Sequence, residues 1–525
     1  MRAPSTLRSA AILAACGLVC ACASDAPGIG TPCDLATDCG ELQCLAGTCQ
    51  PRCQRAPDCG DGYACGEDGV CVLGAGQSGD RCTSEVDCAP GLSCILDLAA
   101  DVNGDLASSC APDHDGAAAG GACASDLDCR NGTCALGLCV DVCAIDRDCA
   151  AANVCTVVPR VENATPEPAS LGRFNGCLPA GGTLSYSIEI TGTTDTVYLP
   201  VPGHARSALA VMTVDDDRQY VGARALVGPD GAALYTLDPD VSEPFDPDNA
   251  VRHTPALESS VLMIPSRPEI PLVTGAYELS LGSFRLDTSG PTPRLATGTA
   301  TPRLEAVVKV GDGSVLDVHF YFLDLDDHPC QAQIGATLTA ATAAAPGGAF
   351  QDEFMAKLRV IFARAGIALS AATYDDLPLV PQFDGLDAAD LPDLLRLASH
   401  RGGVNVFFVR TIAPVGLQIL VGGDKNPGDP NLGPRAGVAV SIDSMCYRDW
   451  ADLGRLAAHA IARQMGLFRN VEPPPFGDFA DPIDDSADET DPAAARINLM
   501  NFSEFGGDDL SNGQEDILRR SAVLR

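Results

Sequence analysis

The dense, regular cysteine pattern in the first third of the chain restricts its fold more than any other feature. The chain has 525 residues and 25 cysteines, and 20 of the cysteines lie between Cys33 and Cys177. They form five units of four, and in every unit five residues separate the first two cysteines. Because the first two and the last two units share the same spacing, the pattern indicates an internal duplication, with the third unit as a single copy.

Disulfide bonds, rather than metal ions, are expected to hold these units together. Zinc sites usually carry close Cys-x2-Cys pairs, which are absent here. Units of about 20 residues with an even number of cysteines, too short to bury a core of their own, are typical of disulfide-rich exported modules. Four cysteines allow three pairings, so the sequence leaves the connectivity of each unit open.

An aspartate precedes the second cysteine of every unit, at Asp38, Asp58, Asp87, Asp128 and Asp148. Aspartate accepts hydrogen bonds from backbone N–H groups in turns, so this residue is expected to cap a turn; calcium binding is the alternative role. The Cys-x4-Asp-Cys pattern, with glycine near the later cysteines, resembles Dickkopf-type cysteine-rich repeats. It also resembles stalk repeats of secreted myxobacteria-type proteins. The resemblance covers residues 33–178 and implies binding or spacing.

The N-terminus has the features of an export signal. Arg2 and Arg8 flank a polar stretch, an apolar run covers residues 10–19, and small residues follow. The letters around Cys22 resemble a bacterial lipobox, with Cys16 as the alternative lipid-bearing cysteine, and cleavage without a lipid as a further alternative. Residues 1–22 are therefore expected to be a signal peptide with a lipobox. The chain would then be an outer-membrane or cell-surface lipoprotein, or a secreted protein.

Charge and hydropathy exclude two kinds of partner. The net charge is −36, with 34 Lys and Arg against 70 Asp and Glu. Because phosphate binding needs clustered cations, we expect no nucleic-acid partner. Beyond the signal, no apolar run reaches about 18 residues, so we expect no transmembrane helix and a membrane contact only through the lipid anchor.

Residues 180–286 read as a β-sandwich. Short β-branched or alternating runs, such as SSVLMIP, are separated by turns rich in Gly, Pro and Asp. Asp215 to Asp217 form a cluster in one turn, which is expected to be solvated, with calcium as the alternative. The Pro/Thr/Gly-rich residues 287–303 read as a linker.

Residues 304–525 change to an α/β pattern. Buried strands are expected in SVLDVHFYFLDL, VNVFFVRTI and AGVAVSID, and a helix in RDWADLGRLAAHAIARQMG. Asp449 is the expected N-cap of that helix, and Gly466 lies where it should end. Cys330 and Cys446 are the only cysteines after residue 177, so one disulfide is expected between them. Cysteine–histidine catalysis is the alternative, but no third group supports it.

The order of strand, helix, strands and a final helix resembles the metzincin zinc proteases, and the pappalysin-like branch in particular. Their signature is His-Glu-x-x-His-x-x-Gly-x-x-His, followed later by a methionine turn. In this chain AAHAIARQMGLFR places His459 at the first ligand position and keeps Gly466. The later segment ARINLMNF then makes Met500 the expected turn methionine.

Three departures from the signature predict loss of the zinc chemistry. Ala460 replaces the glutamate that acts as general base, and Arg463 and Arg469 replace the second and third histidines. Arginine has only hydrogen-bond donors and stays charged, so it cannot ligate zinc. We therefore expect no catalytic residue and no bound metal unless other groups rebuild the site. Lying alone on an apolar helix, His459 is expected to be a buried structural residue.

The chain is thus expected to be multidomain: disulfide-rich repeats, then a β-sandwich, then an α/β metzincin-like domain. The expected function is that of an exported, lipid-anchored surface protein whose inactive protease-like domain binds an unknown protein or peptide. Two alternatives remain: an active zinc endopeptidase with non-standard ligands, and a cysteine-rich adhesin or stalk protein. We also predict that Arg463 or Arg469 pairs with Asp481 or Asp485 from the acidic loop before Met500 and fills the metal position.

Overall fold

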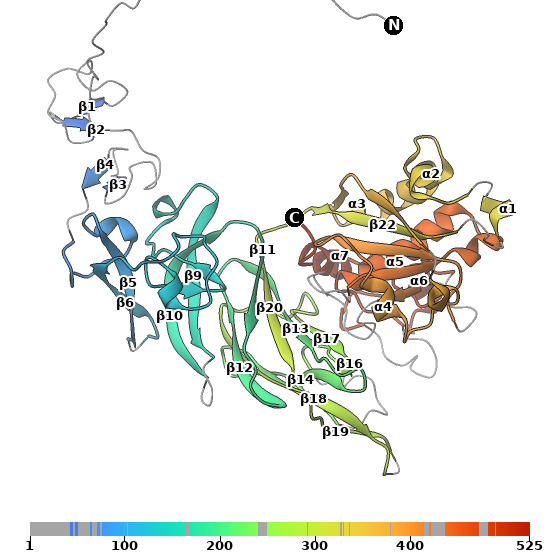
Figure 1. The fold of residues 1–525 in the computed structure, drawn as a ribbon, viewed down its shortest axis with the longest axis horizontal. Helices are drawn as coiled ribbons and strands as arrows, with labels where there is room; N and C mark the ends of the chain where they lie inside the picture. The colour runs from blue at the N-terminus through green and yellow to red at the C-terminus, as the bar shows by residue number, and fades with distance from the viewer. Residues whose placement is uncertain are drawn as a thin grey trace, which may run out of the picture.

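The chain forms several domains made mostly of β-sheet, with a disulfide-rich region at its N-terminal end (Figure 1). A computed structural model describes four short strands before residue 74 and then residues 76–525, without residues 102, 164–167, 240–248, 291, 326–327, 329, 335–336, 379, 414–418, 422–435, 472–480, 489 and 504. The predicted signal peptide and the lipidation predicted at Cys22 or Cys16 lie outside the described residues.

Every cysteine unit contains a small hairpin that brings its last two cysteines side by side. In the first two units the hairpins are β1 (Gln43–Leu45) with β2 (Thr48–Gln50), and β3 (Tyr63–Cys65) with β4 (Cys71–Leu73). The later hairpins are β5 (Leu92–Ala100) with β6 (Leu106–Pro112), β7 (Cys134–Ala135) with β8 (Leu138–Cys139), and β9 (Asn153–Glu162) with β10 (Ala169–Pro179). Their directly paired residues include Cys44 with Cys49, Cys65 with Cys71, Cys94 with Cys110, Cys134 with Cys139, and Cys155 with Cys177.

In the third to fifth units the predicted disulfide bonds are present, and the structure supplies their connectivity; no bond of the first two units lies wholly within the described residues. In the third to fifth units the first cysteine bonds the third, and the second bonds the fourth: Cys82–Cys94, Cys88–Cys110, Cys123–Cys134, Cys129–Cys139, Cys143–Cys155 and Cys149–Cys177. Two bonds therefore fasten one loop across each hairpin, which compensates for the small core of each unit.

In the last three units the recurring aspartate caps a turn, as predicted, whereas Asp38 and Asp58 lie outside the described residues. Asp87 Oδ2 accepts hydrogen bonds from the backbone N–H groups of Thr83 and Ser84 at 2.7 and 3.0 Å. The carboxylates of Asp128 and Asp148 accept the equivalent bonds in the next two units. The turns continue into single 3-10 turns over Glu85–Asp87, Asp126–Asp128 and Asp146–Asp148.

A second acidic position, two residues earlier in these units, was not predicted. Its carboxylate accepts the backbone N–H of the third cysteine at 2.8 or 2.9 Å, in the pairs Glu85–Cys94, Asp126–Cys134 and Asp146–Cys155. The first two units carry Ala36 and Ala56 at this position. This hydrogen bond between the earlier carboxylate and the N–H of the third cysteine, called the carboxylate latch below, is therefore a property of the last three units.

Two antiparallel sheets form a sandwich in the middle of the chain. The first has the order β11 (Gly182–Ile188), β20 (Arg303–Val310), β13 (Ala205–Thr213) and β17 (Ser259–Ile264). The second has the order β12 (Thr194–Val201), β18 (Gly275–Asp287), β14 (Tyr220–Val227) and β15 (Ala233–Thr236), with β16 (Ala256–Leu257) beside β14 and β19 (Arg294–Thr297) beside β18. Met212, Leu262 and Leu279 belong to the core that both sheets share.

The predicted linker and the domain boundary at residue 304 need correction. Residues 294–297 form β19, which extends the β18 edge, and residues 303–310 form β20, which lies between β11 and β13 in the first sheet. A composition rich in Pro, Thr and Gly indicates turns but carries no information about long-range strand pairing. The sandwich therefore extends to Val310.

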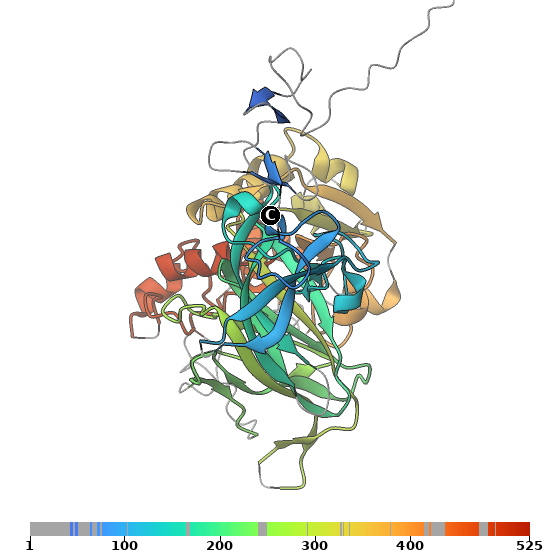
Figure 2. The same cartoon turned by 90° about the vertical axis from the view of Figure 1, so that its left-hand side faces the viewer.

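The first sheet of the sandwich is buried on both faces. Along β13 and β17 the residues alternate: Ala210 and Leu262 face the sandwich core, whereas Leu209 and Met263 belong to the core of the C-terminal domain. At the other end of the sheet, Val310 shares a third core with the repeats. The last repeats, the sandwich and the C-terminal domain thus share successive cores, and Figure 2 views this series from the side of the repeats.

The C-terminal domain is built on a five-stranded sheet in the order β24 (Thr373–Leu377), β22 (Val318–Leu323), β25 (Val404–Val409), β27 (Val438–Ser441) and β26 (Ile419–Val421). The strands are parallel except β26, which is antiparallel to β27. A short parallel pair joins β21 (Val315–Leu316) to β23 (Ala368–Leu369). Such fully buried parallel strands explain the unbroken apolar runs in the sequence.

Helices cover both faces of this sheet. A π-helical turn (Phe350–Met355), α3 (Ala356–Arg364) and α5 (Trp450–Gln464) share a core with one face, and α4 (Leu391–Leu395) shares a core with the other. The shorter helices are α1 (Gln331–Ile334), α2 (Ala340–Ala344), α6 (Pro492–Ile497) and α7 (Asn512–Arg519). The predicted disulfide between Cys330 and Cys446 is formed.

Candidate functional site

Helix α5 positions the residues that resemble the zinc signature. Asp449 caps its first turn by accepting the backbone N–H of Asp452 at 2.8 Å, as predicted. The helix ends at Gln464, and Gly466, two residues later, has a φ of +124°, which favours glycine. A Cβ built there would lie 2.8 Å from the sulfur of Met263 on β17. The glycine is therefore required by its backbone conformation and by a neighbour from the sandwich that the sequence could not reveal.

His459 is buried and lies against the segment that contains the predicted turn methionine. Its Nδ1 is 2.7 Å from the carbonyl oxygen of Leu499, so Nδ1 carries the proton and donates it. Met500, the next residue, is fully buried, and its N–H is bonded to the side chain of Asn498. The structure thus brings together His459 and the Leu499–Met500 turn, which lie 40 residues apart in the chain.

The surroundings of His459 hold its imidazole neutral. Burial lowers its pKa well below the usual value, and the positive charges of Arg469 and Arg463 lower it further. Arg463 is itself buried, and Ala460 belongs to the apolar core of the domain. The three replaced signature positions therefore surround His459 with positive charge and apolar surface, where a zinc site needs ligands and a base.

The acidic loop does not provide the predicted ion pairs. Among the described residues, Asp481 accepts hydrogen bonds from Gln514 and Ser486, and Asp485 accepts the N–H of Gly513 in the first turn of α7. Neither carboxylate forms an ion pair with Arg463 or Arg469. Asp485 fits a helix N-terminus because its charge favours the exposed N–H groups there. At the end of the acidic loop Asp491 caps α6, and the acidic residues 478 and 489 lie outside the described part.

Asp481 gives a prediction about pH. Burial raises its pKa from 3.8 to about 6, so the folded state holds this proton more tightly than the unfolded state. Asp481 therefore contributes up to about 3 kcal/mol to the free energy of unfolding below pH 4, and this contribution is lost as the pH rises towards 6. Replacing Asp481 with Asn should remove this part of the pH dependence. Urea unfolding at pH 4, 5, 6 and 7 measures the free energy of unfolding at each pH. If this free energy changed with pH equally in the wild type and in the Asp481→Asn variant, the assignment would be contradicted. The exposed neighbour Asp484, replaced with Asn, is the control and should leave the pH dependence unchanged.

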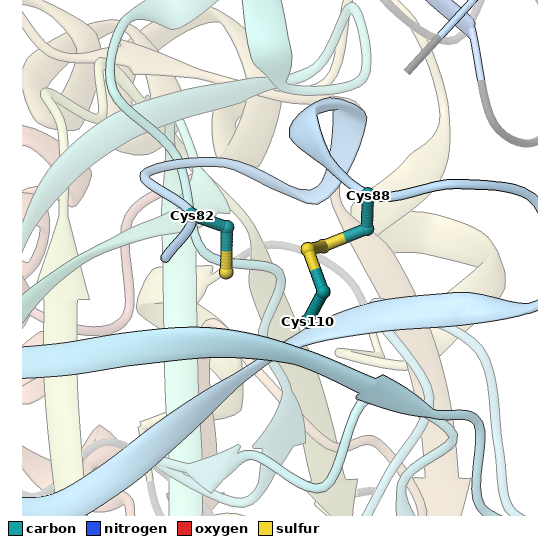
Figure 3. A group of neighbouring side chains, drawn as sticks. All are labelled: Cys82, Cys88 and Cys110. Carbon is teal, nitrogen blue, oxygen red and sulfur yellow. A yellow bond between two sulfur atoms is a disulfide. The ribbon is translucent and has the colours of Figure 1, made fainter. Parts of the chain in front are cut away.

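In the described part of the chain, the groups that could hold a metal ion are three sets of cysteines. One set is Cys82, Cys88 and Cys110, whose sulfurs lie within 4.8 Å of one another, between the loop that carries Cys82 and Cys88 and the strand that carries Cys110 (Figure 3). Cys88 is bonded to Cys110 and Cys82 to Cys94, and the other two sets are likewise disulfide-bonded. Disulfide sulfurs are not thiolate ligands, so these clusters are structural.

The other histidines of the C-terminal domain have structural partners. His319 and His400 stack on each other with ring centroids 4.2 Å apart, beside Thr373 on β24. His328 accepts the N–H of Cys330 at Nδ1 and donates from Nε2 to the carbonyl of Arg410. None of them joins His459 in a metal-binding group among the described residues.

The turn at Asp215–Asp217 likewise uses its carboxylates within the protein. Asp215 pairs with Arg303, and Asp216 accepts hydrogen bonds from the N–H of Arg218 and the side chain of Gln219. These bonds give Asp215 and Asp216 partners within the protein.

Comparisons with known proteins add little. No family model and no curated protein matches the chain. A solved structure of the protein YxiM from Bacillus subtilis aligns with 43% of this chain and 48% of its own length, at 13% identity and a TM-score of 0.11. The chain thus spans about half of that protein, and a score this low carries no argument. No helix in the described residues is long and apolar enough to cross a membrane.

Proposed function

We propose that the C-terminal domain is a metalloprotease-like binding module of metzincin ancestry without peptidase activity. Two features of the fold support the ancestry. The chain runs through a buried strand (β22), a helix (α3), further strands (β25 and β27) and the helix that carries His459, in the order that the resemblance implies. A methionine-containing turn then lies against the histidine, as a methionine turn should.

The surroundings of His459 are the observation that carries the proposal that the domain has no peptidase activity. A catalytic zinc needs three protein ligands and an open position. Here the ring is buried and neutral beside two arginines, whose charges would repel a cation. Ala460 offers no group to deprotonate a water molecule. The domain can therefore keep the shape of a peptidase and bind a protein or peptide without cleaving it.

Metal analysis and a peptidase assay test this proposal together. Purified protein, incubated with zinc and then dialysed, should hold no stoichiometric zinc and should not cleave unfolded casein. One zinc per chain, with casein cleavage that a chelator blocks, would show an active endopeptidase with non-standard ligands instead.

A rebuilt signature provides the matched variant. Replacing Ala460 with Glu, Arg463 with His and Arg469 with His restores the metzincin residues. If the backbone has the inferred ancestry, this folded variant should retain about one zinc per chain after dialysis. A folded variant that takes up no zinc would argue against the ancestry.

We also propose that the protein reaches the cell envelope as a lipoprotein through Cys22. The disulfide bonds of the repeats fit an extracellular protein, and the lipobox supports the anchor. Radiolabelled palmitate should label the protein, and Cys22→Ala should lose the label. If labelling persisted in this variant, the lipid would be on another cysteine, and Cys16 would be the next candidate.

A further inference from the structure

A hollow of about 390 Å³ lies on the outer face of the second sandwich sheet, lined by residues of β14, β15, β18 and β19. Directly paired residues form a row across four strands of this face: Thr196 on β12, Ser280 on β18, Ala225 on β14 and Thr236 on β15. Directly opposed residues point to the same side of a sheet. The small Ala225 leaves space in the middle of a row that otherwise carries hydroxyl groups.

A β-bulge places a cation at this hollow. The register of β14 against β18 shifts between Ala223 and Ala225, so Arg224 is the extra residue. Bulges redirect side chains and are over-represented beside functional sites. The neighbouring position on β18 is Gly282, and a Cβ there would lie 3.5 Å from Cδ of Arg224. The arginine stem therefore lies next to a position on β18 that carries no side chain.

The polar groups around the hollow are available to a ligand. Within the described residues, the Arg224 guanidinium forms no hydrogen bond or ion pair, although acidic residues outnumber basic ones two to one in this chain. The hydroxyl groups of Thr236 and Thr297, which also line the hollow, have no hydrogen-bond partner in the same part of the protein. Leu295 and Leu237 add apolar surface at one side.

We propose that this hollow binds a sugar that carries a carboxylate, that is, a uronic acid. A guanidinium pairs with a carboxylate through two parallel hydrogen bonds. Threonine hydroxyl groups suit the hydroxyl groups of a sugar, and the apolar surface of Leu295 and Leu237 suits the C–H face of its ring. The volume accommodates one or two sugar units. The inference concerns the sandwich alone, so it stands or fails independently of the proposal for the C-terminal domain.

This inference is tested by measuring the binding of D-galacturonate to the full chain with calorimetry or ligand-observed NMR. Galacturonate should bind, and galactose, which lacks the carboxylate, should bind about tenfold more weakly or worse. Replacing Arg224 with Gln should reduce galacturonate binding to a similar extent while leaving thermal stability unchanged, because the side chain has no partner in the described structure.

The control variant is Arg285→Gln. Arg285 follows Phe284 on β18 and points to the opposite face of the strand, so this variant should bind galacturonate like the wild type. Three outcomes would overturn the proposal: no galacturonate binding at millimolar concentration, equal binding of galactose, or equal losses in the Arg224 and Arg285 variants. Binding of acetate as tight as that of galacturonate would also overturn it, because it would show a site for a simple anion.

Discussion

Replacing Gly466 with Ala should lower the free energy of unfolding by roughly 2–4 kcal/mol. A non-glycine residue at φ +124° is strained, typically by about 1–3 kcal/mol. The new methyl group would also lie 2.8 Å from the Met263 sulfur, and overpacking of this kind adds about 1–3 kcal/mol. Denaturant unfolding, read through the Trp450 fluorescence, measures the loss. Trp450, the only tryptophan, begins α5, so it reports on this domain.

Gly402 separates backbone strain from crowding in this test. Its φ is +75°, but a Cβ there would meet nothing within 4 Å. Gly402→Ala should therefore show a smaller loss, of about 1 kcal/mol, from strain alone. Equal losses in the two variants would mean that the contact with Met263 does not contribute.

The second large effect is expected at Leu524, in the segment that follows α7. The side chain is 2% exposed, and the residue forms a β-bridge with Leu316 of the C-terminal domain. Its carbonyl oxygen accepts a hydrogen bond at 2.5 Å from Nζ of Lys309, a buried lysine on sandwich strand β20. This segment thus joins the two domains, and Figure 1 shows the C-terminal end at their junction.

Leu524→Ala should therefore cost about 2–5 kcal/mol, the usual range for a buried leucine that leaves a cavity. Because both domains contact this segment, calorimetry should show the sandwich and the C-terminal domain losing stability together. Leu257, which is 50% exposed on β16, is the matched control. Its replacement with Ala should change stability by no more than about 0.5 kcal/mol. A Leu524 variant as stable as this control would contradict the role of the segment.

The sequence was sufficient wherever the cause of a structure is local. The cysteine spacing and its aspartate predicted the disulfide units and their capped turns, because both depend on residues within one unit. The cap at Asp449 and the helix end at Gly466 were also readable from single positions. The carboxylate latch at Glu85, Asp126 and Asp146 was also visible in the sequence, because aligning the last three units shows an acidic residue at the same position in each.

What the sequence could not predict depends on residues far apart in the chain. Strand β20 joins a sheet whose neighbours β11 and β13 lie about a hundred residues earlier, so its composition gave no sign of its partners. The Leu499 carbonyl that holds His459 belongs to the backbone, which leaves no mark in the sequence. The carboxylates of Asp481 and Asp485 were assigned to the wrong partners because the position of α7 was unknown.

The doubly buried sheet of the sandwich has a practical consequence for dissecting this protein. A fragment cut after Val310 would expose the side of β13 and β17 that carries Leu209, Val211, Val261 and Met263, which the C-terminal domain now covers. Such a surface favours aggregation, so neither domain is expected to behave well when expressed alone or transplanted onto another protein.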